Sequence, residues 1–272
     1  MNFSVLIPVY YKENPSYLEM ALKSIETQTL RANEIILVKD GPLTSELNTI
    51  ISRHQNDTSL PYKIISLYEN KGLGKALNEG LKYCSNEWVA RMDSDDIALP
   101  NRFEKQFTYL KEHPEIDVLS SWICEFYEDE RDCAKQRKVP ENYRDIISFS
   151  KYRNPMNHMS TVFRKEAVLD VDGYKSMNGF EDYFLWMRML QAGKVFGNVP
   201  EVLLKARTGI EMIKRRQGWQ YALDELALEK AAYQIGFWSV LDLNRNFFVR
   251  FLPRLLPVLI VEKLYTLLRK FE

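Results

Sequence analysis

The sequence predicts an α/β fold in which a mainly parallel β-sheet is flanked by helices. Short apolar or β-branched runs alternate with amphipathic helical patterns over about the first hundred residues. Such alternation is typical of parallel strands joined by crossover helices. A chain of 272 residues can form one large domain with an appendage. We expect the α/β domain over residues 1–205 and a helical carboxyl-terminal extension over residues 206–272.

The first elements follow from local patterns. Phe3 to Pro8 is a short apolar strand, and Asn14-Pro15-Ser16 opens a helix in which Ser16 and Glu19 are expected to form a capping box. Further strands and helices alternate after it, with strands at 34–38, 62–67 and 88–92 and helical patterns near 45–54 and 73–84.

From about residue 100 the pattern changes. It predicts a helix at 101–113, a strand at 118–127, a mobile charged loop at 128–138, a return to the sheet at 160–163 and a helix at 181–190. Gly193 is a typical residue for the end of that last helix.

Charge and cysteine content exclude some classes of protein. Thirty-seven basic residues balance thirty-seven acidic ones, so no global field favours nucleic acid, and none is expected as a partner. Three cysteines at Cys84, Cys124 and Cys133 show no metal-ligand spacing, and their odd number argues against a disulfide framework. With no signal peptide visible at the amino terminus, we expect a cytoplasmic protein.

Three carboxylates follow the strand at 88–92, in the run Asp93-Ser94-Asp95-Asp96. In extended backbone, side chains two residues apart lie on the same side, so Asp93 and Asp95 can face one ligand. Mg²⁺ and Mn²⁺ prefer such oxygen ligands, and substrate phosphates often complete their coordination. By itself an acidic triplet is more typical of a solvated turn. Ligands of open sheets bind beyond the carboxyl ends of the strands, which is where this run falls.

Several motifs in order resemble those of the family 2 glycosyltransferases over about residues 3 to 205. They are Val5-Leu6-Ile7-Pro8-Val9-Tyr10, Val38-Lys39-Asp40-Gly41, Asn70-Lys71-Gly72 with Ala76 and Asn78, Asp93-Ser94-Asp95-Asp96, and Gly179-Phe180-Glu181-Asp182-Tyr183. The resemblance implies an inverting transferase with the GT-A fold, a Rossmann-like sheet that binds nucleotide-diphospho-sugars.

The resemblance also implies roles for individual residues. The nucleotide-sugar would be bound by Pro8, Tyr10, Asp40, Asn70, Lys75, Asn78, Asp93 and Ser94. A divalent cation, Mn²⁺ or Mg²⁺, would be held by Asp93 and Asp95, and Asp182 would be the general base. Taken alone, Asp40-Gly41-Pro42 is an ordinary turn, Lys75 can belong to a solvated helix face, and Asp182 can be a helix cap.

Four residues are candidates for the acceptor side of the site: His158, Glu181, Trp186 and Arg188. Trp186 could stack on a sugar ring and Arg188 could contact phosphate. Core packing is the alternative for an aromatic at helical spacing, and a lone His such as His158 is equally consistent with a structural hydrogen bond.

The carboxyl-terminal region is apolar and basic. The stretch 211–235 predicts a charged helix, and Leu252 to Val261 is too short and too interrupted to span a membrane. Basic residues flank the apolar ones at Arg245, Arg250, Arg254, Lys263, Arg269 and Lys270. Peripheral contact with anionic headgroups on the inner face of the cytoplasmic membrane and packing against protein are equally consistent with this pattern.

The resemblance therefore predicts a metal-dependent transferase that moves a hexose from a UDP-sugar to an oligosaccharide or polyprenyl-diphosphate-linked acceptor, in the synthesis of a bacterial O-antigen or capsule. The alternatives are a dTDP-rhamnose transferase of the same family, a sugar nucleotidyltransferase and a non-catalytic nucleotide-sugar-binding scaffold. The glycine- and arginine-rich loop of nucleotidyltransferases is missing after the first strand, at Tyr10-Tyr11-Lys12-Glu13-Asn14. Fold alone does not identify the donor.

Overall fold

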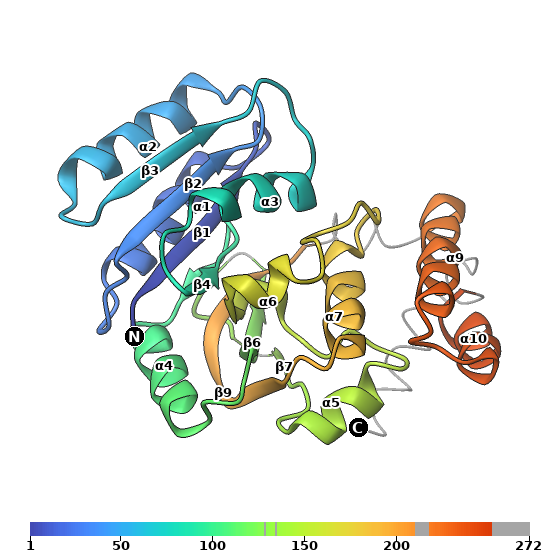
Figure 1. The fold of residues 1–272 in the computed structure, drawn as a ribbon. Helices are drawn as coiled ribbons and strands as arrows, with labels where there is room; N and C mark the ends of the chain where they lie inside the picture. Colours follow the sequence, from blue (N-terminus) through green and yellow to red (C-terminus); the bar gives the residue numbers. More distant parts are fainter. Residues whose placement is uncertain (128, 134, 210–217, 252–272) are drawn as a thin grey trace. The chain divides into compact units, whose positions relative to one another are not determined.

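The computed structural model describes residues 1–127, 129–133, 135–209 and 218–251. The chain divides into two compact units. One consists of Met1–Ser176 with Glu181–Arg207, and the other of Met177–Phe180 with Thr208–Glu272. The first unit contains the β-sheet, and the described part of the second is helical (Figure 1).

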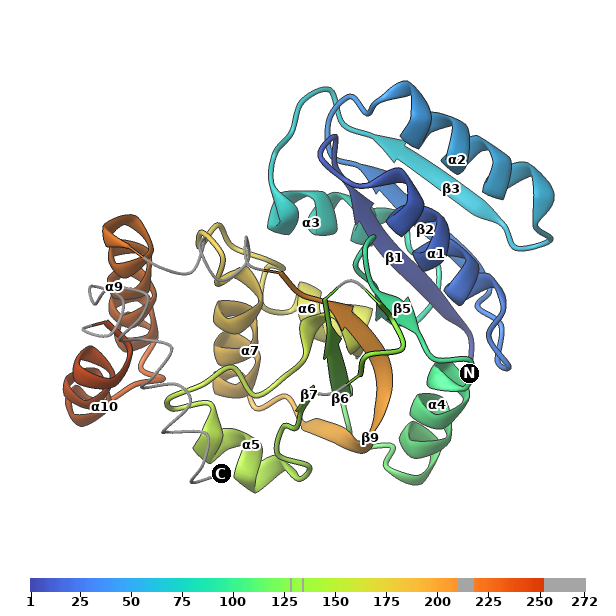
Figure 2. The same ribbon diagram turned by 180° about the vertical axis from the view of Figure 1, so that it is seen from behind.

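A nine-stranded sheet forms the centre of the first unit (Figures 1 and 2). The strands lie in the order β3-β2-β1-β4-β8-β6-β9-β5, and β7 pairs with β6. Their bounds are β1 Phe3–Val9, β2 Glu34–Lys39, β3 Tyr62–Ser66, β4 Trp88–Arg91, β5 Ile97–Ala98, β6 Val118–Phe126, β7 Lys135–Arg137, β8 Val162–Arg164 and β9 Phe196–Arg207. The first four strands are parallel, which confirms the predicted α/β class.

Strand β8 enters antiparallel between β4 and β6, so the second half of the sheet is mixed. This confirms the predicted return of residues near 160–163 to the sheet. The 12-residue strand β9, which the sequence analysis did not predict, runs parallel to β6. Its Leu204 and Lys205 pair with β6 on one side and with β5 on the other, and the strand ends at residue 207 beside the loop that follows β4.

Helices cover both faces of the sheet. The helices of the first unit are α1 Pro15–Glu26, α2 Ser45–Asp57, α3 Leu73–Tyr83, α4 Arg102–Glu112, α5 Tyr143–Phe149, α6 Lys165–Leu169 and α7 Glu181–Gln191, with a 3₁₀ turn η1 at His158–Ser160. Apolar residues of α1, α2 and α4 form one core with the β1 side chains that include Phe3 and Val5. Helix α3 packs on the opposite face, where Gly80 lies against Leu6 and Val38 (Figures 1 and 2).

Three local expectations were wrong. Asn14 caps α1 by accepting from Ser16 N at 2.9 Å, so the capping box of Ser16 and Glu19 does not form. The region predicted as a mobile charged loop contains β7, which pairs with β6. That hairpin also brings Cys124 and Cys133 together as a disulfide, with 5.6 Å between their Cα atoms. Counting cysteines could not show this, because three cysteines can include one pair.

The helical elements in the described part of the second unit are α9 Trp219–Gln234, α10 Val240–Asn246 and the π-helical turn η2 Phe247–Phe251. Arg250, expected on a basic surface, instead pairs with the buried carboxylate of Glu225. The expected basic residues at 254, 263, 269 and 270, and the stretch 252–261, lie outside the described residues. Within the described ranges, no helix combines the length and the apolar character that crossing a membrane requires.

Candidate active site

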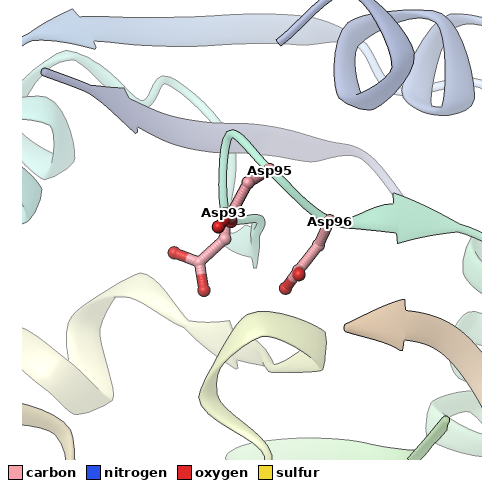
Figure 3. Close-up of side chains that lie close together, drawn as sticks. All are labelled: Asp93, Asp95 and Asp96. Atoms are coloured by element: carbon pink, nitrogen blue, oxygen red, sulfur yellow. The ribbon is translucent and has the colours of Figure 1, made fainter. Parts of the chain in front are cut away.

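The loop between β4 and β5 gathers the carboxylates of Asp93, Asp95 and Asp96 (Figure 3). One carboxylate oxygen from each residue lies within 4.8 Å of the others. Asp93 and Asp95 are half-buried, whereas Asp96 is buried. Several carboxylate oxygens at this spacing suit a hard divalent cation such as Mg²⁺ or Mn²⁺. The residues therefore fit the cation that the sequence predicts here.

Like charges meet in this loop, which we call the acidic loop (residues 93–96). Burial, with the charges of Asp93 and Glu13, raises the pKa of Asp95 to about 7. Burial and the charge of Asp95 raise the pKa of Asp96 well above its ordinary value. A negative cluster with such perturbed acids is typical of a functional site, because ordinary surface carboxylates are well solvated.

Two residues that the sequence analysis missed hold the acidic loop in place. Glu13, in the loop after β1, accepts a hydrogen bond from the Ser94 hydroxyl. Arg207, at the end of β9, donates its backbone N–H to Asp96 Oδ1 at 2.8 Å and its Nε–H to the Asp95 carbonyl at 3.2 Å. Glu13 follows a strand at the same sheet edge as the acidic loop, so the position of strand ends could have identified it. Arg207 could not be found this way, because β9 was not predicted.

A buried guanidinium lies directly beneath the acidic loop. Arg91 is 1% exposed and pairs with Asp93. Its Nε and Nη1 atoms have no hydrogen-bond partner within the described part of the chain. The Arg91 carbonyl accepts from Arg102 Nη2 at 2.7 Å. These contacts fix the orientation of the Asp93 carboxylate.

Asp40, directly after β2, is hydrogen-bonded to the segment that leads into α3. Its two carboxylate oxygens accept the backbone N–H groups of Lys71 at 2.7 Å and Gly72 at 3.0 Å. Gly41 allows this approach, because with φ of +87° a Cβ there would lie 2.7 Å from Asn70 N. Asp40 therefore has a clear structural role. Each carboxylate oxygen has two lone pairs, so accepting capacity remains.

The other predicted donor-side residues differ in accessibility. Tyr10 is 38% exposed after β1, and Lys75 is exposed in the first turn of α3. Pro8 is buried within β1, and the Asn70 amide donates to the Asp40 carbonyl at 3.3 Å.

Asn78, predicted to bind the donor, instead clamps the backbone of Tyr174. Its Nδ2 donates to the Tyr174 carbonyl at 2.7 Å, and its Oδ1 accepts from the Tyr174 N–H at 2.8 Å. The Tyr174 hydroxyl lies 2.8 Å from Nε2 of His158, which is also buried. Burial and the charge of Arg91 keep the pKa of His158 well below 6.5, so its ring is neutral at pH 7. His158 therefore has a structural hydrogen bond.

Asp182 is half-buried in the first turn of α7. Its Oδ2 accepts from Asn154 Nδ2 at 2.7 Å, and its Oδ1 from the Tyr183 N–H at 2.7 Å. Burial raises the pKa of Tyr174, the charge of Arg91 opposes this rise, and the charges of Asp182 and Asp93 add to it. Asp182 and the acidic loop both belong to the first unit.

Two acceptor-side predictions need correction. Trp186 is fully buried between His158 and Phe196, so its ring cannot stack on a sugar. Arg188 donates to the backbone carbonyls of Val171 and Gly173, so its guanidinium holds a turn rather than a phosphate. Helical spacing identifies residues on one face but not whether that face is turned to the core.

Glu181 is half-buried beside Asp182. Its side chain packs against Gly74 of α3, where a Cβ would lie 3.2 Å from Glu181 Cγ. Glu181, predicted on the acceptor side, therefore contacts α3.

The model of the family described as Glycosyl transferase family 2 matches residues 4–172 of this chain. That range includes the acidic loop and ends before Asp182. The pattern of that family therefore covers β4 and β5, between which the acidic loop lies, but not β9.

Two curated relatives are similar over nearly the whole chain. The amylovoran biosynthesis glycosyltransferase AmsE of Erwinia amylovora is 41% identical over 268 residues, covering 98% of this chain and 99% of its own. The UDP-Gal:alpha-D-GlcNAc-diphosphoundecaprenol beta-1,3-galactosyltransferase of Escherichia coli is 38% identical over 255 residues, covering 94% of this chain and 92% of its own.

Among solved structures, TarS residues 1–349 of S. aureus in complex with UDP-GlcNAc shares the fold, with a TM-score of 0.66 and 20% identity. The match covers 93% of this chain and 72% of the TarS chain. The GT-A fold expected from the sequence is thereby confirmed.

Proposed function

This chain belongs to glycosyl transferase family 2, and on that premise we propose that it moves a hexose from a UDP-sugar to a lipid-linked oligosaccharide in the synthesis of a bacterial surface polysaccharide. The observation that carries this proposal is the presence, in one unit, of a cation-suited acidic loop and a separate, hydrogen-bonded Asp182. The similar proteins named for amylovoran biosynthesis and for galactosyl transfer to a diphosphoundecaprenol-linked sugar support the substrate classes.

The donor diphosphate is proposed to lie at the acidic loop. Asp93 and Asp95 would hold a Mn²⁺ or Mg²⁺ ion, with Asp93 fixed by Arg91 and the loop fixed by Glu13 and Arg207. Such an ion, when bound, supplies positive charge that stabilises the leaving nucleoside diphosphate. Because Arg91 already pairs with Asp93, Asp95 is the carboxylate more available to the ion.

The nucleoside would be bound along the ends of β1, β2 and β3. Tyr10 offers an exposed ring, and Asp40 has lone pairs left to accept from a uracil N–H or a ribose hydroxyl. Lys75, exposed at the start of α3, can approach the diphosphate. Asn70 and Ser94 would line the same region, while Asn78 supports it indirectly through Tyr174.

Asp182 is proposed to be the general base. The acceptor hydroxyl attacks the anomeric carbon on the face opposite to UDP, the bond to the diphosphate oxygen breaks, and the hydroxyl proton passes to the Asp182 carboxylate. The product therefore has inverted anomeric configuration. Half-burial leaves Asp182 accessible, and each of its oxygens retains a lone pair beside the hydrogen bond that it accepts.

Calorimetric titration of UDP with and without Mn²⁺ tests the donor side of this proposal. We expect binding that is tighter with Mn²⁺, and loss of that gain in Asp95→Ala. Release of the nucleoside diphosphate then identifies the donor, each donor being tested with a GlcNAc-diphospholipid acceptor: UDP would come from UDP-galactose, UDP-glucose or UDP-N-acetylglucosamine, and dTDP from dTDP-rhamnose. Equal affinity for UDP with and without Mn²⁺ would contradict the assignment of Asp95 as a metal ligand. Binding of UDP without transfer from any donor would favour a non-catalytic nucleotide-sugar-binding scaffold.

We also propose that the second unit meets an anionic membrane surface, which would place the enzyme on the inner face of the cytoplasmic membrane. Large apolar side chains are exposed on α10 and η2, among them Leu241 at 80% and Phe248 at 65%. The sequence that follows is apolar and basic, as suits peripheral contact with acidic lipid. Co-sedimentation with phosphatidylglycerol vesicles should fall in Leu241→Asp with Phe248→Asp, whereas unchanged sedimentation would contradict membrane contact through this surface.

A further inference from the structure

Asn154 contacts the proposed base directly. Its Nδ2 lies 2.7 Å from Asp182 Oδ2, and its Oδ1 accepts the Met156 N–H at 3.2 Å. These two contacts define which way the amide points, because the reversed amide would place an oxygen against the carboxylate and an N–H group against another N–H group. Asn154 is therefore a donor toward Asp182.

The backbone around Asn154 is held on several sides. The Asn154 carbonyl accepts from Arg137 Nη2 of β7 at 3.1 Å. The next carbonyl, that of Pro155, accepts from the buried Asn198 amide at 3.2 Å. Pro155 itself restricts the backbone of the residue before it. A side chain whose backbone is held by several hydrogen bonds can fix the geometry of a reacting group.

The same loop is anchored in the core two residues after Pro155. Asn157 is fully buried, and its Nδ2 donates to the Ser121 carbonyl of β6 at 2.8 Å. Its backbone N–H donates to the Ser120 hydroxyl at 3.2 Å. Asn154 is therefore presented to Asp182 from a segment attached to the sheet, while Asp182 itself belongs to α7.

We propose that Asn154 is a positioning residue for the general base. Its N–H fixes one oxygen of Asp182, the Tyr183 N–H fixes the other, and together they set the plane of the carboxylate toward the incoming acceptor hydroxyl. An amide does this without adding positive charge, so it orients the base without forming an ion pair with it. The inference rests on the proposed role of Asp182 and adds a residue that the family resemblance did not indicate.

Two substitutions separate this role from a merely structural one. Asn154→Ala removes both contacts of the amide, whereas Asn154→Asp keeps an oxygen for Met156 N–H and replaces the donor toward Asp182 by a second acceptor. A hydrogen bond to a charged group is typically worth enough for about a tenfold to hundredfold effect. We expect kcat to fall by about that factor in Asn154→Ala and further in Asn154→Asp, with KM for the UDP-sugar unchanged in both.

The order of the two variants is the decisive result. If Asn154 served only to hold Met156, Asn154→Asp would be the milder change, and an activity order of Asp above Ala would overturn the proposal. Full kcat in both variants would also overturn it. Asn142→Ala is a matched control, because Asn142 caps α5 through the Asp145 N–H at 3.1 Å. It should lower thermal stability slightly and leave kcat unchanged.

The Asp182→Asn background shows which proposal has failed when a result is negative. If Asn154 acts through Asp182, then Asn154→Ala should not slow Asp182→Asn any further, because effects on one shared function are not additive. Full transfer by Asp182→Asn alone would contradict the assignment of Asp182 as the general base. An inactive Asp182→Asn together with fully active Asn154 variants would contradict only the proposed role of Asn154 and would leave that of Asp182 standing.

Discussion

Asp95 and Asp182 are both half-buried carboxylates in the first unit, but their neighbours differ. Around Asp95 lie other acids, with the charges of Asp93 and Glu13 acting on it in addition to burial. Around Asp182 lie neutral donors, the Asn154 amide and the Tyr183 N–H. One residue belongs to a loop stabilised by tertiary contacts, and the other to the first turn of a helix.

This difference indicates what each group is suited to bind. Crowded carboxylates repel one another and gain most from a multiply charged cation. A carboxylate with neutral hydrogen-bond donors is oriented but keeps its own charge, which suits the acceptance of a single proton. Substitution of Asp182 should therefore impair transfer and spare metal-dependent UDP binding, whereas substitution of Asp95 should impair both.

Asp182→Asn should have the largest effect. It preserves the shape of the side chain but removes the proton acceptor, so we expect transfer to fall by about a thousandfold, within the range typical of general-base catalysis. UDP affinity in the presence of Mn²⁺ should stay unchanged, as measured by calorimetry. Asp170→Asn is the control, since Asp170 pairs with Lys194 on the surface. If Asp182→Asn retained more than about a tenth of the activity, Asp182 would not be the general base, and the proposed difference in function between Asp182 and Asp95 would be wrong.

Asp95→Asn should differ in that it also impairs UDP binding. Loss of a cation ligand should remove the gain in UDP affinity that Mn²⁺ gives, and should reduce transfer by about a hundredfold or more, since Lewis-acid stabilisation is worth several kcal/mol. The measurement is the ratio of UDP dissociation constants with Mn²⁺ and with EDTA. A ratio equal to that of the unsubstituted protein would show that Asp95 is not a ligand.

The same substitution should make the metal-free protein more stable. Because Asn removes one charge from a like-charged cluster, we expect the free energy of unfolding of Asp95→Asn in EDTA to rise by about 0.5–1 kcal/mol. Asp182→Asn should show no such gain, because among the described residues Asp182 does not belong to a cluster of three acids like that of the acidic loop. Urea denaturation of both variants provides the comparison. Equal or lower stability of Asp95→Asn would mean that repulsion in the acidic loop is already compensated.

The sequence predicted the parallel half of the sheet because β1, β2 and β4 are buried apolar runs. The alternation of extended backbone also predicted that Asp93 and Asp95 would face one side. Strand β9 was missed, because Pro200, Glu201 and Lys205 interrupt its apolar pattern. Without β9, the contact of Arg207 with the acidic loop could not be foreseen.

Side-chain partners were the least predictable feature. Arg91 and Arg102 are charged residues that composition would place on the surface, yet both are buried beneath the acidic loop. Trp186 and Asn78 match positions that suggest ligand contact, but their neighbours come from segments distant in sequence. Asn154 before Pro155 resembles an ordinary turn, and only the fold brings it to Asp182. Local patterns do not contain these long-range distances.

A histidine beside two glutamates, away from the acidic loop, gives a second small effect on stability. His54 of α2 lies 3.0 Å from Glu26 and 3.2 Å from Glu19, both on α1. The hydrogen bond to Glu26 raises the pKa of His54 above 6.5, although burial opposes it. A raised folded-state pKa contributes stability that is full below the unfolded value and is lost as pH rises through the folded value.

His54→Gln should therefore destabilise the protein more at pH 6 than at pH 9, by a difference of about 1 kcal/mol in the free energy of unfolding. Urea denaturation of both proteins at the two pH values measures this difference. A larger loss at pH 9 would mean that His54 is buried as a neutral ring. In the acidic loop, by contrast, three carboxylates lie together, so we expect removal of one charge to stabilise the metal-free protein. At His54 we expect removal of the charge to destabilise the fold.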